Sequence, residues 1–327
     1  MTLRLRVVQS AWESTTARVA AEFGSVVPVV KGTGYGFGRS TLMPMAARLA
    51  NEHGDGLIAV GTVFEATDVP DDCTAMVLTP HLDDLPVTLS RDTVLTVGSV
   101  AHVDALTRQS WDCPVVVKVR SSMRRHGVRK SEMSDLIAHA NASGLRVIGI
   151  SFHPPLISDE EDNLEEVRDF LRRIPPNSNV FLSHLSPQSC NDLQTEFDGM
   201  TMSIRVGTAL WHADKSQMQL STDVLSVHAV KAGARVGYHR SEIKEDGHVL
   251  SLGVGTAQGV AELDEGRSPF HFARRRMIMV EKPHMHTSMV FVPEGDPLPE
   301  VGDWIDVQRP LVTTSPDELQ WVSATSF

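Results

Sequence analysis

The feature that most constrains the fold is a series of eight short apolar runs, rich in β-branched residues, in the first two thirds of the chain. Most of these runs are separated by stretches with helical periodicity, at residues 41–53, 100–109, 131–141 and 160–174. Apolar runs without polar alternation are typical of strands buried on both faces, and helical crossovers join parallel strands. The pattern therefore predicts an α/β fold, a (β/α)8 TIM-like barrel. The runs are residues 26–30, 57–61, 75–78, 93–97, 115–119, 147–152, 180–185 and 204–210.

An open, doubly wound sheet is the alternative for the same alternation of strands and helices. Such sheets often carry a GxGxxG turn with an acidic residue downstream. No such fingerprint occurs in this sequence, so the barrel is favoured.

The texture of the sequence changes after about residue 222. Strand-like runs continue, but turn signals replace the helices between them. We therefore predict a barrel over residues 10–222 and a smaller all-β domain over residues 223–327. Residues 1–9 alternate apolar and basic side chains, and we expect this strand to join the sheet of the β-domain.

Composition excludes several classes of partner and location. The net charge of -11 argues against nucleic acid or an anionic membrane. The three cysteines lack CxxC spacing, which fits reduced thiols better than disulfides or a zinc site. No run approaches the ~18 apolar residues of a membrane span, and no signal peptide is visible. These features predict a cytoplasmic protein that binds a small molecule.

Lys31 stands directly after the first buried run, in the segment VVKGTGYGFG at residues 29–38. An unpaired ammonium is costly to bury at the tip of a strand. A lysine amine there can instead form an imine with an aldehyde such as pyridoxal phosphate. The alternative is a glycine-rich turn from which the lysine extends into water.

Other candidate side chains also follow the runs, where a barrel places its active site. Each has a structural alternative: Arg125 lies in a basic cluster, His153 precedes two prolines in a turn, and Ser186 is suited to cap a helix. Their shared position at strand ends favours a binding site. The candidates are Lys31, Tyr35, Arg125, His153, Ser186, Arg205 and Gly207.

These segments resemble the alanine racemase family of pyridoxal-phosphate enzymes, which have an N-terminal barrel and a C-terminal β-domain. VVKGTGYGFG is similar to the family's VVKANAYGHG, which implies that Lys31 is the Schiff-base lysine and Tyr35 a phosphate contact. VKVRSSMRRHGV resembles KVDTGMxRLGV. This match places Arg125 near the cofactor's phenolic oxygen and the substrate, and Lys118 where many members carry a lysine that positions that arginine. GISFHPP is similar to GxxTHxA and assigns His153 to the cofactor.

Three later segments extend the resemblance. SHLSPQ resembles HxANS and assigns Ser186 to the phosphate. IRVGTALW resembles VRPGxxLYG, which places Arg205 at the pyridine nitrogen and Gly207 at the phosphate. RVGYHRS resembles VGYG, so Tyr238 would be the second catalytic base. The chain has only two tyrosines, and both fall on family positions.

The resemblance implies a two-base amino-acid racemase that uses pyridoxal 5'-phosphate. Lys31 would exchange the α-proton on one face of the substrate, and Tyr238 on the other. It also implies a homodimer, in which Tyr238 and Met285 reach the partner's active site.

Several departures from the family pattern leave the substrate open. Arg120, Ser121 and Ser122 replace the family's DTG, and residues 253–259 replace its GYADG segment. His284-Met285-His286 stands at the CMD segment, which implies substrate contacts for His284 and Met285. The substrate therefore need not be alanine.

These departures motivate two alternative functions on the same scaffold. One is an aldolase or decarboxylase, and the other is a non-catalytic cofactor-binding protein, against which the presence of residues 223–327 argues. His284 and His286, read as two positions on one face of a strand, could hold a metal. No third ligand is evident, so we predict no metal site and expect the two histidines to shape the substrate pocket.

Overall fold

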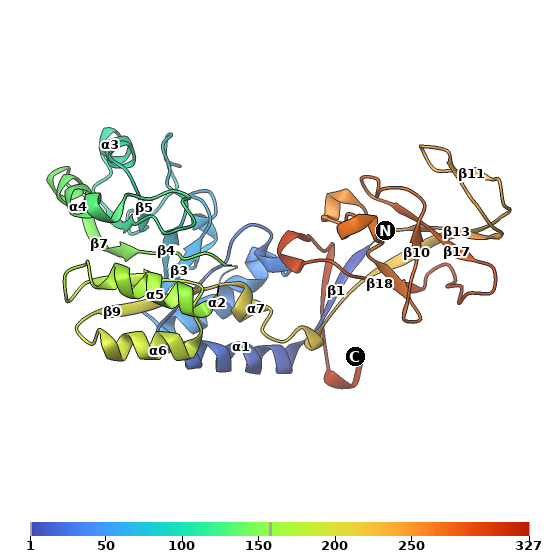
Figure 1. Cartoon of the computed structure of the whole chain (residues 1–327), viewed down its shortest axis with the longest axis horizontal. Coiled ribbons are helices and arrows are strands. Elements are labelled where there is room, and N and C mark those ends of the chain that lie inside the picture. The colour runs from blue at the N-terminus through green and yellow to red at the C-terminus, as the bar shows by residue number, and fades with distance from the viewer. Residues whose placement is uncertain (1, 157–158, 327) are drawn as a thin grey trace. The chain divides into compact units, whose positions relative to one another are not determined.

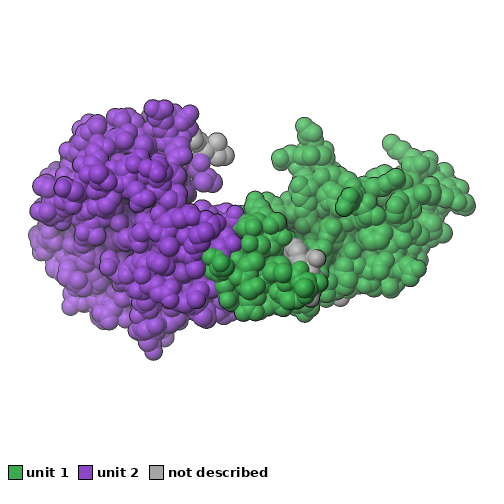
Figure 2. Space-filling model, turned by 90° about the horizontal axis from the view of Figure 1, so that it is seen from below, with its two compact units in different colours: residues 1–14, 33–38, 214–327 green, residues 15–32, 39–213 purple. Residues whose placement is uncertain are grey.

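The computed structural model describes residues 2–156 and 159–326 (Figure 1). The chain divides into two compact units, coloured separately in Figure 2. The first, the barrel unit, comprises residues 15–32 and 39–213. The second, the β unit, comprises residues 1–14, 33–38 and 214–327.

The barrel unit is built on eight parallel strands. Six form one ladder in the order β2-β9-β8-β7-β6-β5, and β3 pairs with β4. Parallel bridges from Val29 to Ala59 and from Met76 to Val94 join the two ladders, so the ring of strands closes. This closure confirms the predicted barrel and excludes the open sheet. The strands are β2 (Val26–Pro28), β3 (Leu57–Val60), β4 (Thr74–Val77), β5 (Leu95–Val97), β6 (Pro114–Lys118), β7 (Arg146–Ser151), β8 (Asn179–Leu182) and β9 (Thr201–Val206).

Helices connect most of the strands, as the periodicity predicts, and each buries an apolar stripe. Phe170 of α5 stacks on Phe152, with ring centroids 4.4 Å apart. Two connections have no α-helix: η2 (Ala66–Asp68) lies between β3 and β4, and irregular backbone joins β4 to β5. The α-helices are α1 (Gln9–Phe23), α2 (Arg39–His53), α3 (Val100–Arg108), α4 (Met133–Ala142), α5 (Glu160–Leu171), α6 (Pro187–Glu196) and α7 (Thr208–Trp211).

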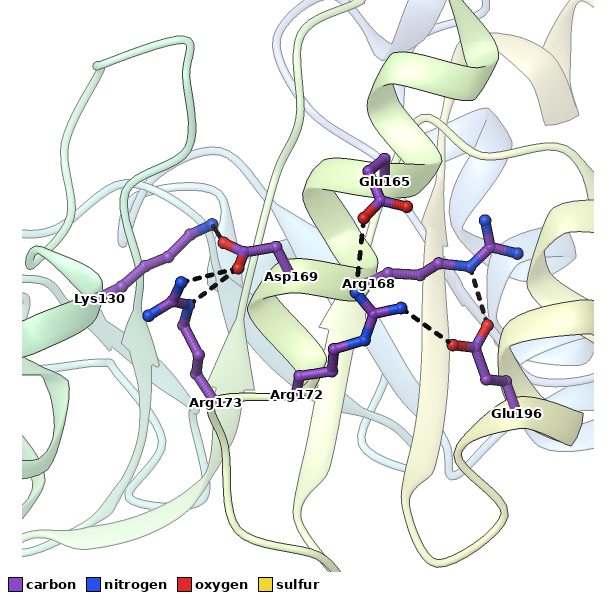
Figure 3. Close-up of polar contacts among 7 residues, drawn as sticks. All are labelled: Lys130, Glu165, Arg168, Asp169, Arg172, Arg173 and Glu196. Carbon is purple, nitrogen blue, oxygen red and sulfur yellow. Dashed lines mark hydrogen bonds and ion pairs between the residues drawn. The ribbon is translucent and has the colours of Figure 1, made fainter.

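Helix α5 is tied to its neighbours by surface ion pairs (Figure 3). Asp169 accepts hydrogen bonds from Arg173 and Lys130, and these bonds lower the pKa of its carboxyl to about 2. Glu196 of α6 pairs with Arg168 and Arg172. Exposed pairs of this kind contribute little individually, so the apolar contacts carry most of the stability of α5.

The β unit is organised around a nine-stranded sheet that contains the first and the last strand of the described chain. β1 (Leu3–Val8) runs antiparallel to β10 and parallel to β19. Its apolar side chains are fully buried at Leu3, Leu5 and Val7. The predicted domain boundary at residues 222 and 223 stays a prediction. The other strands of this sheet are β10 (Met218–Val230), β13 (Gly247–Leu252), β14 (Phe270–Phe272), β15 (Arg275–Arg276), β16 (Ile278–Met279), β17 (Ser288–Pro293), β18 (Trp304–Val307) and β19 (Glu318–Val322).

A separate two-stranded hairpin, β11 (Arg235–Val236) with β12 (Ser241–Glu242), carries Tyr238 in its turn. The metal alternative read His284 and His286, in the segment that faces this turn, as two positions on one face of a strand. The structure does not place them on a strand, because β16 ends at Met279 and β17 begins at Ser288. Pro283 has no N–H for a ladder, and the His284 N–H donates to the carbonyl of Thr287 in a tight turn.

No α-helix in the described part of the chain is both long enough and apolar enough to span a membrane.

Candidate active site

Lys31 lies at the carboxyl end of β2, where the barrel strands open. The Val30 N–H donates to the Ala59 carbonyl, which aligns this end of the strand with β3. Desolvation lowers the pKa of the Lys31 amine, and the positive charges of Arg125 and Arg205 lower it further, while Glu65 opposes the shift. A lysine with a lowered pKa has a larger neutral fraction, which is the form that attacks an aldehyde.

Arg205 forms the floor of this site. It belongs to β9, and its side chain is buried. Nη2 donates to the carbonyls of Phe152 (2.8 Å) and Phe181 (3.2 Å), and Nε donates to that of Leu182 (3.3 Å). Burial, followed by the charge of Arg125, lowers the pKa of the guanidinium. The three carbonyls fix the plane of the side chain at the carboxyl ends of β7 and β8.

Lys118 is the last residue of β6, and only 4% of its surface is exposed. Its Nζ has no hydrogen-bond partner among the described residues. Burial and the charges of Arg205 and Arg125 hold the pKa of this amine well below its usual range. A buried nitrogen without a partner, which feels the positive charges of two arginines, is suited to contact a bound anion.

His153 and His184 meet at the ends of β7 and β8, with ring centroids 4.3 Å apart. The carbonyl of His153 accepts a hydrogen bond from the Ser121 hydroxyl (2.6 Å), and Nδ1 of His184 lies 3.0 Å from the carbonyl of Pro154. Desolvation, followed by the charge of Arg205, holds the pKa of His153 far below the usual histidine value. Desolvation also lowers the pKa of His184. Both rings are therefore neutral at physiological pH.

Arg125 lies in the loop after β6 and is exposed. A parallel bridge between Val119 and Val128 holds the base of this loop. The neighbouring His126 is partly buried, and desolvation, followed by the charge of Arg125, lowers its pKa to about 4. The loop thus holds a solvent-facing guanidinium above the buried Lys118 and Arg205.

The predicted site residues of the barrel unit therefore fall into two groups. Five of them influence one another electrostatically and define what we call the cationic cluster. The other two, Ser186 and Gly207, start α6 and α7. The cationic cluster consists of Lys31, Lys118, Arg125, His153 and Arg205.

Ser186 is the N-cap of α6, which is the helix-capping role that the sequence offered as the alternative to a phosphate contact. Its Oγ accepts the Ser189 N–H (3.2 Å) and contacts the Ser189 hydroxyl, which in turn donates to Glu160 (2.8 Å). Hydrogen bonds from Ser186 and Ser189 lower the pKa of Glu160. A phosphate contact for Ser186 and for Gly207, the residue before α7, stays a prediction.

The remaining predicted residues belong to the β unit. Tyr35 is buried in the turn η1 (Gly34–Gly36), with φ at 56°. Tyr238 and Met285 are exposed, and the ring of His284 lies against that of Tyr238. The described part of the chain contains no group of three or more side chains placed to hold a metal ion.

Residues 7–215 match the sequence family described as alanine racemase, N-terminal domain. The chain belongs to the alanine racemase family. This match covers the barrel and all the residues of the cationic cluster. A search of curated protein sequences found no match.

Solved alanine racemases share the fold over nearly the whole chain. The enzyme from Bartonella henselae, whose structure contains covalently bound pyridoxal phosphate, superposes with a TM-score of 0.73 at 17% identity, over 98% of this chain and 100% of that one. The biosynthetic alanine racemase of Pseudomonas aeruginosa gives 0.71 at 18% identity, over 98% and 99%. The Streptomyces lavendulae enzyme gives 0.70 at 16% identity, over 99% and 98%. At these identities the similarity shows the common fold.

Sequence reasoning missed His184, Glu65 and Glu281. His184 lies two positions before Ser186 in the SHLSPQ segment that the resemblance had already singled out. Glu65 and Glu281 act on backbone N–H groups of distant loops, and no motif marks them.

Proposed function

We propose that this protein is a pyridoxal-phosphate-dependent amino-acid racemase, with Lys31 and Tyr238 as its two bases. The observation that carries the proposal is the cationic cluster: a lysine amine of lowered pKa beside two arginines at the carboxyl ends of the barrel strands. Active sites of barrels of this type are built at that end of the strands.

The residues of the cluster fit this cofactor. Pyridoxal phosphate brings a phosphate and a phenolic oxygen, both negatively charged, to a site where cations repel one another. It also offers an acceptor to the unpartnered Lys118 Nζ. When bound, it supplies an aldehyde that joins amines and a ring that withdraws electrons from the substrate's α-carbon.

Lys31 and Arg205 have separate tasks in this scheme. The Lys31 amine, neutral more readily because of its lowered pKa, takes or returns the α-proton on one face of the substrate. Arg205 is held rigidly by three carbonyls and keeps its proton near neutral pH. Arg205 would hold the cofactor's ring nitrogen without giving up a proton to it, which would weaken electron withdrawal by the ring and restrain side reactions.

Tyr238 serves the opposite face. Tyr238 is 82% exposed and Met285 is 67% exposed. This exposure suits residues that contact a second copy of the chain. We propose a homodimer in which both reach the partner's site, with Arg125, His284 and Met285 contacting the substrate. Tyr35, His153, Ser186 and Gly207 are proposed cofactor contacts.

The proposal is tested first for the cofactor and then for the reaction. Pyridoxal phosphate added to the purified protein, trapped with borohydride and located by peptide mass spectrometry, should modify Lys31 and leave Lys31→Ala unmodified. Single L- and D-amino acids are then incubated with the loaded protein in deuterium oxide. Deuterium at Cα with loss of optical purity identifies the substrate, and Tyr238→Phe should lose exchange from one enantiomer. A modified Lys31 without α-exchange for any amino acid would contradict racemisation.

Another reaction on the same scaffold, an aldol cleavage or a decarboxylation, remains the alternative raised by the altered His284 segment. In the structure, Nε2 of His284 pairs with Glu281, so this nitrogen is already occupied. Loss of the amino acid itself, with release of an aldehyde or of carbon dioxide, would identify this alternative in the same incubations.

A further inference from the structure

A nearly buried carboxylate lies beneath the turn that carries Tyr238. Only 4% of the Glu281 side chain is exposed. Oε1 accepts the backbone N–H of Tyr238 (2.9 Å), and Oε2 accepts that of His239 (3.0 Å). Oε1 also lies 2.5 Å from Nε2 of His284. One side chain therefore holds the backbone of the turn and the imidazole that faces it.

The approach of Glu281 to the turn depends on Gly237. A Cβ at this position would lie 2.4 Å from Oε1 of Glu281, a distance that no real contact allows. The backbone also has a φ of +76°, which favours glycine. Gly237 thus gives the carboxylate access to the two N–H groups that follow it.

The ring of His284 packs against the ring of Tyr238, with centroids 4.3 Å apart and planes inclined by 44°. Nε2 pairs with Glu281, and Nδ1 faces the Thr287 hydroxyl at 3.5 Å. Nε2 is therefore occupied, and the contact of His284 with Tyr238 that the structure shows is between the two rings. His284 therefore acts on Tyr238 through ring contact.

The backbone on either side of His284 is itself fixed. The carbonyls of His284 and Met285 accept the N–H groups of Thr256 (2.8 Å) and Ala257 (2.9 Å). Gly255 permits this packing, because a Cβ there would lie 2.2 Å from the His284 carbonyl oxygen. The ring that faces Tyr238 is thus presented by a well-ordered loop.

We infer that Glu281 and His284 form a brace that positions the phenol of Tyr238 for proton transfer. The inference rests on the proposed function, in which Tyr238 is a base. An exposed tyrosine on a two-stranded hairpin would otherwise sample several rotamers, and ordering it before the reaction removes that entropy cost from the barrier. Within the brace both are positioning residues, since in that role they act on the reaction through Tyr238.

The first experiment measures the brace without any activity. Uniform 3-fluorotyrosine labelling gives two ¹⁹F resonances, because the chain has two tyrosines, and Tyr238→Phe assigns them. His284→Ala should shift and narrow the Tyr238 resonance and leave that of Tyr35 in place. His284→Phe should retain most of the ring-current shift, which separates ring contact from misfolding. His286→Ala, exposed and two residues away, is the matched control. A Tyr238 resonance unmoved in both His284→Ala and Glu281→Gln would overturn the brace.

The second experiment distinguishes a positioning role from a folding defect by comparing α-proton exchange on the two faces of the substrate. In the loaded protein, Glu281→Ala should slow by ~100-fold the α-deuterium exchange that Tyr238→Phe abolishes, the effect of misplacing a reacting group by about 1 Å. Exchange through Lys31 should be unchanged. An equal fall on both faces would overturn the inference. No exchange in the unmodified protein would instead overturn the proposed function, and the fluorine spectra would still decide the brace.

Discussion

The carboxylate of Glu65 accepts a hydrogen bond from the backbone N–H of Gly32, the residue directly after Lys31 (3.0 Å). Its second oxygen accepts the N–H of Gly61 at the end of β3 (2.7 Å). Arg39 donates to the Gly32 carbonyl (2.8 Å). Gly32, the residue that follows the proposed catalytic lysine, is therefore held by a carboxylate at its N–H and by a guanidinium at its carbonyl.

Removal of this acid should affect both stability and Lys31. Glu65→Ala leaves two N–H groups without their acceptor, and we expect the free energy of unfolding in urea to fall by about 1–3 kcal/mol. Glu65→Gln should be intermediate, because its NH₂ group would face an N–H donor. Trapping of pyridoxal phosphate at Lys31 should slow in the same order. Glu52→Ala, at an exposed acid in α2, is the control; equal effects of the two alanine variants would contradict this role.

Replacement of Lys118 by methionine should stabilise the protein without cofactor. The substitution keeps the apolar stem and removes a buried amine that lacks a partner and repels two arginines. We expect the free energy of unfolding to rise by about 1–3 kcal/mol. Lys130→Met breaks an exposed pair with Asp169 and should lower it by less than about 1 kcal/mol. A Lys118→Met protein that unfolds at lower urea than the unmodified chain would show that the amine has a stabilising partner.

Arg205 should tolerate no other cation. Lysine carries a single ammonium in place of the planar fork, so Arg205→Lys cannot reproduce donation to three carbonyls. We expect a loss of at least about 1.5 kcal/mol in unfolding free energy, together with weaker retention of pyridoxal phosphate after dialysis. Arg124→Lys, at an exposed position one residue before Arg125, should leave both measurements unchanged. Full stability and retention in Arg205→Lys would refute the proposed role of the fork.

The histidines of the site should make the protein without cofactor less stable in mild acid. Their pKa values are lowered on folding, to about 4 for His126, from an unfolded value of 6.5. Below pH 6.5 the unfolded chain therefore binds more protons than the folded chain, and stability falls as the pH falls from 7 toward 4. Asp169 does not contribute in this range, because its stabilisation is present above its unfolded pKa of 3.8 and is lost only as the pH approaches 2.

The urea midpoint measured from pH 7 to 4.5 tests this linkage. His126→Phe should flatten the dependence, since phenylalanine binds no proton. His81→Phe, at a partly exposed histidine that lies 3.0 Å from the carbonyl of Asp84 and edge-on to Phe64, is a suitable control. An unchanged slope in His126→Phe would contradict the linkage.

The barrel was predictable because the sequences of its strands are short apolar runs rich in Val, Ile and Leu. The rule that a barrel's site lies at the carboxyl ends of its strands was then enough to group Lys31, Arg125, His153 and Arg205, although none of their contacts could be predicted. The short strands β14 and β19 were not predicted, since three to five residues with mixed polarity give no period.

Side chains that bind distant backbone groups could not be found in this way. Glu65 and Glu281 act only because folding brings loops to them, and acidic residues in loops are common. The reading of His284 and His286 as strand positions did not hold either, because Pro283 has no N–H and the His284 N–H bonds within its loop to the carbonyl of Thr287.

The position of β1 between β10 and β19 has a consequence for synthesis of the chain on the ribosome. Arg4 pairs with Glu318, so β1, which is translated before the barrel strands, has one neighbour that is translated after them. All eight barrel strands lie before residue 214, and their ring can close while this neighbour is still missing. β1 must wait, with one hydrogen-bonding edge open, until residues 318–322 have been made. Residues 3–8 are therefore a segment of the nascent chain that would gain from shielding by a chaperone.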